Sequence, residues 1–421
     1  MNSIANEEVA IEMRGSSRRS FLAGFTAAVA GLPAAAAPAG EAYWRMVRRQ
    51  FAFREDKIPM NAANMCPPPR AVTERLVELT RDTDADCSFN NRAKFKKLLE
   101  QSRAHIARQL GVSPDEIALV RNTTEANNIV CNGLPLEPGD EVLLWDQNHP
   151  TNNVAWDVRA ARFGFKVRRV STPPRPAGPE ELAEVFLRAL SPRTRVLSIT
   201  HLSNVTGMRL PVREIAEAAR KRGVYVHVDG AQTWGAFDLN LREMGCDSFS
   251  ASAQKWFVGP REAGILYVRA EHIPRIWPGT VGAGWGREVS PAVKGARKFE
   301  SMGQRDDARL AALDTAADFL DAIGQKRVEA RVLELAGILK GRLADLGVKL
   351  VTPRTPELSG GVCIIEAPEE NRRKAVDILY RDWGIAAAPT GGLRLCPHIY
   401  NTMEHIDRAV QAVKAVRKLL A

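Results

Sequence analysis

Lys255 and Asp229 are the two residues of this sequence whose types and surroundings best suggest chemistry. Asp229 follows the apolar run 224–228 and precedes small residues, beginning with Gly230, against which a ring could lie; Lys255 follows the run 247–251. Burial lowers the pKa of an amine and leaves the neutral nucleophile that forms an imine with a carbonyl group. A carboxylate at a strand end can pair with a protonated ring nitrogen. The pair predicts a ring cofactor bound through Lys255, although a lysine considered alone could extend to solvent.

An anion site is predicted at residues 122–128, which read Asn-Thr-Thr-Glu-Ala-Asn-Asn and precede an apolar helical stretch. The hydroxyls of Thr123 and Thr124 and the free backbone N–H groups of a helix N-terminus would bind a phosphate, although the same residues could simply cap the helix. His149 follows the apolar run 142–145, and its flat imidazole could stack on a ring or be a satisfied structural residue. A phosphate, a ring, a carboxylate and a lysine together indicate pyridoxal 5'-phosphate (PLP).

Short apolar runs that alternate with helical patterns must position these residues. The runs 141–145, 196–200, 224–228 and 264–268 are separated by helical segments such as 211–222. This alternation is typical of βαβ units and predicts an α/β fold with a mostly parallel sheet. Ligands bind at the carboxyl ends of the strands in such sheets, which is where the candidate residues fall.

The pattern changes near residue 305. A long helical stretch over 309–346, an apolar run at 361–365 and helices over 371–383 and 403–420 predict a smaller C-terminal α+β domain. The predicted organisation is a signal peptide at 1–37, an N-terminal arm at 38–60, a large PLP-binding domain at 61–290, a connector at 291–304 and the small domain at 305–421.

Residues 1–37 look like a twin-arginine (Tat) export signal. The pair Arg18 and Arg19 precedes a weakly apolar, Ala-rich run at 21–32 and four alanines at 34–37. The run is too short to span a bilayer, and the alternative is an uncleaved disordered tail. The signal predicts export by the Tat machinery to the periplasm or the medium, without stable membrane insertion.

The charge pattern and the cysteine spacing argue against two functions, nucleic-acid binding and metal binding. The 421 residues carry a formal net charge of +10, yet the basic residues form no long run and do not interleave with aromatic residues. We therefore expect no nucleic-acid partner, and a basic cleft for an anionic cofactor or substrate accounts for the excess. The six cysteines show no metal-ligand spacing, so no metal site is predicted, while disulfides stay open.

Five motifs, in this order, resemble the aminotransferase class V family, whose members adopt PLP fold type I. The resemblance covers nearly the whole chain after the signal. The motifs are Thr-Thr-Glu-Ala-Asn-Asn at 123–128, Asn-His-Pro-Thr-Asn-Asn at 148–153, Thr-His-Leu-Ser-Asn-Val-Thr-Gly at 200–207, Val-Asp-Gly-Ala-Gln at 228–232 and Ser-Ala-Gln-Lys at 252–255.

The resemblance implies a role for each candidate residue. Lys255 would carry PLP as a Schiff base, Asp229 would pair with the pyridine nitrogen, and His149 would stack on the ring. Gln232 would bond the ring hydroxyl, Asn204 would lie near the ring and imine, and Thr123 or Thr124, Ser252 and Gln254 would hold the phosphate.

Two further residues would bind outside the cofactor's own pocket. Arg394, in the segment 393–402, would bind the substrate carboxylate through its guanidinium fork. The segment 299–306 is similar to one found in isopenicillin N epimerase-like members. Gln304 within it would bind the phosphate of the neighbouring subunit's cofactor, which predicts a homodimer with shared active sites.

The resemblance also implies a reaction class. An amino-acid or peptide substrate would displace Lys255 to form an external aldimine, and the freed amine would remove the α-proton. An aminotransferase or an isopenicillin N epimerase-like activity is predicted first, with a β-lyase of the C–S lyase type or a catalytically silent binding protein as alternatives. Gln254 replaces the histidine common before the lysine, and the short stretch 384–393 contains no cysteine. The sequence therefore predicts that the chain is not a cysteine desulfurase.

Overall fold

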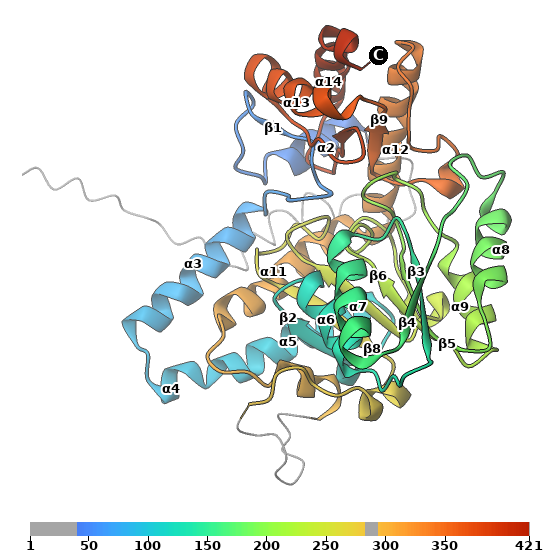
Figure 1. Ribbon diagram of the computed structural model, residues 1–421. Coiled ribbons are helices and arrows are strands. Elements are labelled where there is room, and N and C mark those ends of the chain that lie inside the picture. Colours follow the sequence, from blue (N-terminus) through green and yellow to red (C-terminus); the bar gives the residue numbers. More distant parts are fainter. Residues whose placement is uncertain (1–39, 283–293, 421) are drawn as a thin grey trace, which may run out of the picture. The chain divides into compact units, whose positions relative to one another are not determined.

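A seven-stranded sheet with the order β2-β8-β7-β6-β5-β3-β4 organises the larger part of the computed structural model, which describes residues 40–282 and 294–420 (Figure 1). Strand β8 runs antiparallel to both of its neighbours, and every other pair is parallel. The predicted α/β fold with a mostly parallel sheet is confirmed. The strands are β2 (Ile117–Val120), β3 (Glu141–Trp145), β4 (Lys166–Val170), β5 (Thr194–Thr200), β6 (Tyr225–Asp229), β7 (Ser248–Ser252) and β8 (Gly264–Val268).

Burial explains why the strands read as continuous apolar runs. Every residue of β3, β6, β7 and β8 is buried, because helices cover both faces of a mostly parallel sheet. Strand β4 lies at the edge and has the sequence Lys-Val-Arg-Arg-Val, with only its last residue buried. Charged side chains on an edge strand discourage pairing with other chains.

Helices pack around this sheet. Ala126 and Val130 of α6 and Trp156 of α7 form one core with apolar residues of β2, β3, β5, β6 and β8. A smaller core joins Leu79 of α3, Phe95 of α5 and the start of α11. The helices are α3 (Arg70–Ala85), α4 (Phe89–Arg92), α5 (Lys94–Gln109), α6 (Thr123–Gly133), α7 (Pro150–Phe163), α8 (Pro179–Ala189), α9 (Val212–Arg220), α10 (Leu241–Met244) and α11 (Asp307–Ile323).

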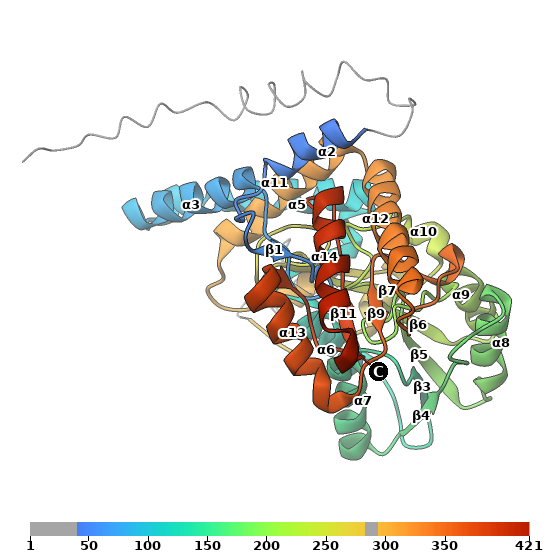
Figure 2. The ribbon, with the colours of Figure 1, turned by 90° about the horizontal axis from the view of Figure 1, so that it is seen from above.

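A second large core combines the two ends of the described chain. After α2 (Glu41–Arg48), strand β1 (Ile58–Pro59) pairs in parallel with β10 (Ile385–Ala386), while β9 (Cys363–Ile365) and β11 (Leu393–Leu395) form an antiparallel pair. Helices α12 (Gln325–Asp345), α13 (Glu369–Trp383) and α14 (Met403–Ala415) pack against these strands, as the view from above shows (Figure 2). The arm residues Ile58 and Met60 are part of this core.

The structure corrects the predicted helix over 309–346. Two helices, α11 and α12, occupy this stretch, because Gly324 between them has a φ of +92°, which only glycine adopts without strain. Helix α11 packs against α3 and α5. Residues 39–421 belong to one compact unit, so the boundaries of the large and small domains stay predictions.

Parts of the predicted organisation fall outside the described residues. The predicted signal peptide at 1–37 lies outside them, as do residues 283–293 at the junction of the predicted large domain and connector. Within the described ranges, no helix has the length and apolar character needed to cross a membrane.

Candidate functional site

All strands of the sheet except β8 end at one edge. Since β8 is antiparallel to both β2 and β7, these two run in the same direction, which β6, β5 and β3 share. Thr123 follows β2, Ser252 ends β7 with Lys255 close behind, Asp229 ends β6, and His149 follows β3. The topology therefore brings the predicted residues to the carboxyl ends of the strands, where the sequence placed them.

Lys255 is half-buried, and charged groups lie around its amine. Burial lowers its pKa, the Asp229 carboxylate opposes that shift, and the Arg394 guanidinium adds to it. Burial also lowers the pKa of His149, with the positive charge of Lys255 as the next cause. These effects place the four side chains within electrostatic range of one another. A lysine with a lowered pKa holds more of the neutral amine that attacks a carbonyl carbon.

Asp229 is held by a buried hydrogen-bond network. Its Oδ2 accepts from Asn127 Nδ2 at 3.1 Å, and its Oδ1 accepts from the backbone N–H of Ala231 at 3.0 Å. Asn127 Oδ1 accepts in turn from His227 Nε2 at 2.9 Å and from Ser250 Oγ at 2.5 Å. Burial lowers the pKa of His227 to about 4, so its ring is neutral and carries its proton on Nε2. Neutral donors thus fix one orientation of the carboxylate and leave its charge in place.

Packing within the sheet accounts for Gly230, the residue after Asp229. A Cβ at this position would lie 1.8 Å from Cζ of Phe249 on the adjacent strand β7. The sequence predicts that a ring lies against the small residues after Asp229. At Gly230 the Phe249 ring of the protein itself already excludes a side chain.

Thr123 and Ser252 join helix α6 to strand β7 at the predicted phosphate site. Ser252 Oγ accepts from the backbone N–H of Thr123 at 2.8 Å and lies 2.7 Å from Thr123 Oγ1. The residue that caps α6 is Asn122, so neither threonine hydroxyl is used as the cap. Thr124 is exposed, and Gln254 has a buried Oε1 without a hydrogen-bond partner among the described residues. Thr123 and Ser252 lie at the N-terminus of α6, and a helix N-terminus favours an anion.

His149 has a structural partner in addition to its predicted role. Its Nδ1 accepts from the backbone N–H of Thr151 at 3.2 Å and lies 2.8 Å from Thr151 Oγ1, so the imidazole caps helix α7. This cap fixes the position of the ring. Stacking of the imidazole on the cofactor stays a prediction.

Gln232 is buried and its side chain already bonds at both ends. Its Nε2 donates to the carbonyl of Ala63 at 3.1 Å, and its Oε1 accepts from Trp256 Nε1 at 2.8 Å. One amide hydrogen is left for the predicted bond to the ring hydroxyl, which stays a prediction. Trp256 follows Lys255 directly, so Gln232 also anchors the lysine-bearing segment.

Arg394 is a buried cation, only 4 % exposed, on strand β11. Its Nη1 donates to the carbonyl of Asn204 at 2.9 Å, and its Nη2 donates to Asn61 Oδ1 at 3.0 Å. Its Nε has no partner, and it forms no ion pair within the described residues. A buried charge without a counter-ion is costly, so this guanidinium indicates a binding place for an anionic group.

Gln304 is exposed on the surface. Its Oε1 accepts from Arg92 Nη1 at 3.1 Å, and both residues line the same surface hollow. The predicted reach of Gln304 to a neighbouring subunit stays a prediction.

Comparison with known proteins identifies the family. The model of the family described as "Aminotransferase class-V" matches residues 61–412. The chain belongs to the aminotransferase class V family. It is 31% identical over 390 residues to isopenicillin N epimerase of Streptomyces clavuligerus, covering 89% of this chain and 98% of that protein. The epimerase of Amycolatopsis lactamdurans is 32% identical over 394 residues, covering 89% and 99%.

Proteins with other names are similar over comparable lengths. A probable cysteine desulfurase of Xylella fastidiosa (strain Temecula1 / ATCC 700964) is 28% identical over 415 residues, covering 91% of this chain and 98% of that protein. A mutant of C-DES with glycine covalently linked to its PLP cofactor has a TM-score of 0.80 and 25% identity, covering 87% and 98%. The comparisons therefore show the family and fold type I. The relatives are named for different reactions, so the family alone does not specify the reaction of this chain.

PLP is the cofactor of this class V chain, and the residues present fit it. Burial lowers the pKa of Lys255, the member of the site that would form the covalent link. Asp229 has a carboxylate oriented for the ring nitrogen, and the N-terminus of α6, where Thr123 contacts Ser252, suits the phosphate. When bound, PLP supplies a pyridinium ring that withdraws electrons from the substrate's α-carbon.

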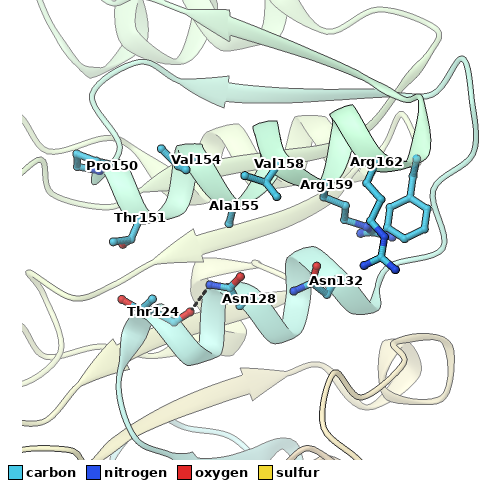
Figure 3. Close-up of a pocket in the computed structure, with 11 residues that line it drawn as sticks. Thr124, Asn128, Asn132, Pro150, Thr151, Val154, Ala155, Val158, Arg159 and Arg162 are labelled. Atoms are coloured by element: carbon cyan, nitrogen blue, oxygen red, sulfur yellow. Dashed lines mark hydrogen bonds between the residues drawn. The ribbon is translucent and has the colours of Figure 1, made fainter.

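A groove of about 500 Å³ runs between α6 and α7 and begins at Thr124 and Thr151, next to the predicted phosphate site (Figure 3). Its walls carry the apolar Val154 and Val158, and its far end carries arginines, among them Arg159. None of Lys255, Asp229 and Arg394 lines it. The groove adjoins the class V site without containing its reactive groups.

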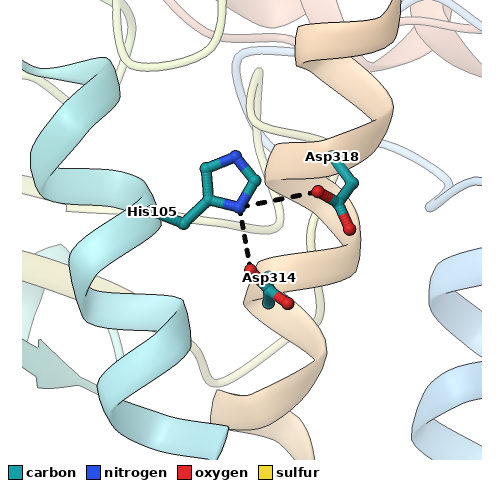
Figure 4. A group of neighbouring side chains, drawn as sticks. All are labelled: His105, Asp314 and Asp318. Atoms are coloured by element: carbon teal, nitrogen blue, oxygen red, sulfur yellow. Dashed lines mark hydrogen bonds and ion pairs between the residues drawn. The ribbon is translucent and has the colours of Figure 1, made fainter.

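A separate cluster of titratable groups joins α5 to α11 (Figure 4). His105 Nδ1 lies 2.8 Å from Asp314 Oδ1 and 3.7 Å from Asp318 Oδ1, and its Nε2 lies 2.8 Å from Asp321 Oδ2. Burial acts to lower the His105 pKa, but hydrogen bonds to Asp314 and Asp321 outweigh it and raise the pKa to about 9. A protonated imidazole has no lone pair for a metal, so this cluster is an ion-pair contact between helices.

Asn127 and His227 were not predicted as site residues, although the sequence around each contains a local indication of its position. Asn127 lies four residues after Thr123, which puts it on the same face of a helix, and it belongs to a motif already quoted. His227 lies two residues before Asp229, on the same face of β6. The third unpredicted residue, Asn61, had no such local signal.

Proposed function

We propose that the chain moves the α-proton of an amino-acid or peptide substrate, as an epimerase or an aminotransferase. The observation that carries this proposal is Arg394, a buried guanidinium with no ion pair among the described residues and within electrostatic range of Lys255. A substrate with an α-carboxylate would supply the missing counter-ion and place its α-carbon near the lysine. The similarity to two isopenicillin N epimerases over most of both chains supports the same assignment.

The residues divide the work by their chemistry. Arg394 orients the carboxylate, because two parallel hydrogen bonds fix both its position and its plane. Lys255, with its pKa lowered by burial, accepts the α-proton as a neutral amine and returns it. Asp229, held by Asn127, keeps a negative charge opposite the ring nitrogen. Delivery of a proton to the opposite face of the α-carbon by a donor other than Lys255 would invert the substrate, and delivery of the proton to the cofactor instead of the α-carbon would lead to transamination.

The proposal excludes cysteine desulfurase activity. Ala388 and Arg394 exchange both backbone hydrogen bonds, 3.0 and 2.8 Å long, and so close residues 389–393 into a tight turn without a cysteine. Burial raises the pKa of the Cys363 thiol to about 12 and also raises that of Cys396, so neither is a ready nucleophile. Cys87 is exposed, but it lies in the connection between α3 and α4, which carries none of the predicted site residues.

A β-lyase is the second candidate. The observation in its favour is the structural similarity to C-DES, which is described as a cystine C–S lyase and whose mutant has a TM-score of 0.80 over 87% of this chain. Elimination also begins with removal of the α-proton, so Lys255 and Arg394 would serve it equally well. Only the product distinguishes this reaction from the first candidate.

Two wider assignments belong to the same proposal. The protein works as a homodimer in which Gln304, exposed on the surface, completes the partner's phosphate site. It is exported folded through the Tat pathway, which the paired arginines Arg18 and Arg19 support.

Product analysis tests the reaction. PLP-loaded protein is incubated in D₂O with L- and D-amino acids and short peptides, and the α-hydrogen and products are followed by NMR. Deuterium at an inverted α-carbon indicates an epimerase, and a keto acid without ammonia indicates an aminotransferase. Pyruvate together with ammonia from a substrate with a β leaving group indicates the lyase. Absence of α-hydrogen exchange with every compound contradicts the proposal.

Arg394→Ala tests the carboxylate assignment. Loss of one partner from a desolvated charge pair costs about 2–5 kcal/mol, or roughly 30-fold to several-thousand-fold in apparent affinity. We expect kcat/KM for amino acids to fall by such a factor while PLP stays bound. The loss should disappear when ethylamine, which has no carboxylate, is the probe in a spectral titration of the cofactor. Equal kcat/KM per folded site in the variant and the natural protein rejects the assignment.

A further inference from the structure

Within residues 40–282 and 294–420, only neutral groups accept hydrogen bonds from the Arg394 guanidinium. The backbone carbonyl of Asn204 accepts from Nη1, and the side-chain amide oxygen of Asn61 accepts from Nη2. A guanidinium has five N–H groups, so three, including the buried Nε–H, are left for a ligand. Both acceptors fix the plane of the group without cancelling its charge.

The backbone around Asn61 is fixed from several directions. Asn61 follows β1, which pairs with β10, and it forms a parallel bridge with Cys396, two residues beyond Arg394. The backbone N–H of Cys396 donates to Met60 at 2.7 Å, and Ala62 donates to the Cys396 carbonyl at 3.2 Å. The carbonyl of Asn61 itself accepts from the backbone N–H groups of the two residues that end its own turn. The Asn61 side chain therefore reaches Arg394 from a backbone that has little freedom to move.

We propose that Asn61 is a positioning residue that fixes the Arg394 guanidinium for the substrate carboxylate while leaving its positive charge uncompensated. The inference rests on the proposed function, in which Arg394 binds that carboxylate. An amide is the side chain that meets both needs at this place. An aspartate has the same shape and accepts the same hydrogen bond, but its charge would occupy the guanidinium as an internal ion pair.

Two substitutions separate this role from a purely structural one. Asn61→Asp keeps the size and the acceptor atom and adds a charge, whereas Asn61→Ala removes the acceptor and adds no charge. The substrate is the amino acid that exchanges its α-hydrogen fastest in the D₂O panel. We expect KM to rise about 30-fold or more in Asn61→Asp and only about 3- to 10-fold in Asn61→Ala, with kcat changed less than KM in both.

A structural role predicts the reverse order, because Asn61→Asp preserves the contact that Asn61→Ala destroys. A larger KM increase in Asn61→Ala than in Asn61→Asp therefore overturns the inference. Asn64→Asp is the matched control, since it places the same charge on an exposed side chain of the same turn. Solvent screens that charge, so we expect a KM within about threefold of the natural value.

Thermal stability supplies a readout that needs no substrate. Asn61→Asp gives a buried cation a counter-ion, so its Tm should equal or exceed that of the natural protein, while Asn61→Ala should melt lower. A lower Tm in Asn61→Asp than in Asn61→Ala overturns the inference. If Arg394→Ala leaves kcat/KM unchanged, the proposed function itself fails. If Arg394→Ala raises KM and Asn61→Asp does not, only the role of Asn61 is lost.

Discussion

Asn127→Asp tests whether the network behind Asp229 is built from neutral groups for an electrostatic reason. The substitution replaces Nδ2, which lies 3.1 Å from Asp229 Oδ2, with an oxygen, and it keeps an acceptor for His227 and Ser250. Two unit charges at this distance repel by about 5 kcal/mol at an effective dielectric constant of about 20. Protonation of a carboxyl group with an ordinary pKa near 3.9 costs about 4 kcal/mol at pH 7 and about 1.5 kcal/mol at pH 5.

Protonation is therefore the cheaper outcome, and the folded variant should take up a proton that the unfolded chain does not hold at neutral pH. Because the folded state then binds more protons, the free energy of unfolding falls as pH rises. Relative to the natural protein, we expect a loss of about 4 kcal/mol at pH 7 and about 1.5 kcal/mol at pH 5. PLP affinity should also fall at neutral pH by about tenfold or more, since the shared proton removes charge from the ring's partner.

Urea denaturation of the PLP-free protein at the two pH values measures the first effect, and spectral titration with PLP measures the second. Asn132→Asp is the control, because it makes the same change at an exposed position of the same helix α6. A surface change of this kind should alter stability by less than about 0.5 kcal/mol at either pH. A destabilisation of Asn127→Asp that is equal at pH 5 and pH 7 would refute the electrostatic argument.

Three further predictions concern other parts of the molecule. Lys255→Ala should abolish the visible absorbance band that borohydride removes, while a natural protein that binds no PLP contradicts the covalent assignment. The pKa of His105 is raised to about 9 in the folded protein, so its stabilising effect is complete below about pH 6.5 and disappears between about 6.5 and 9. Thermal or urea unfolding should show a loss of roughly 2–3 kcal/mol over that window, which His105→Asn should lack; an identical slope in the variant rejects the ion-pair role. Arg18→Lys combined with Arg19→Lys should retain the protein inside the cell with unchanged stability, and undiminished export counts against the Tat interpretation.

Local sequence patterns predicted those parts of the fold that have a local cause. Strands β3, β6 and β8 are buried on both faces, so they read as unbroken apolar runs that end in polar residues. The helix break at Gly324 was missed because the helical periodicity continues on both sides of a single glycine. Lys255 and Asp229 could be predicted as site residues because charged side chains rarely follow buried apolar runs unless they have a function.

The contacts that orient these groups were not predictable in the same way. Asn127 meets Asp229 across 102 residues, and Asn61 meets Arg394 across 333. A pattern of apolar and polar residues reports which face of an element is buried, but not which distant side chain lies against it. The phosphate site shows the same limit, because only the structure reveals that Asn122 caps α6 and leaves the threonine hydroxyls for other partners.

The pairing of β1 with β10 has a consequence for the order in which the protein is made. Ile58 lies opposite Ile385, and Arg394 receives its partner Asn61 only after β10 and β11 have left the ribosome. Residues 58–61 are therefore synthesised long before the segments with which they pair. Because the loop between the two segments is long, we expect this part of the site to assemble late and slowly. A chain stopped before β10 would contain Lys255 and Asp229 yet lack the substrate anchor.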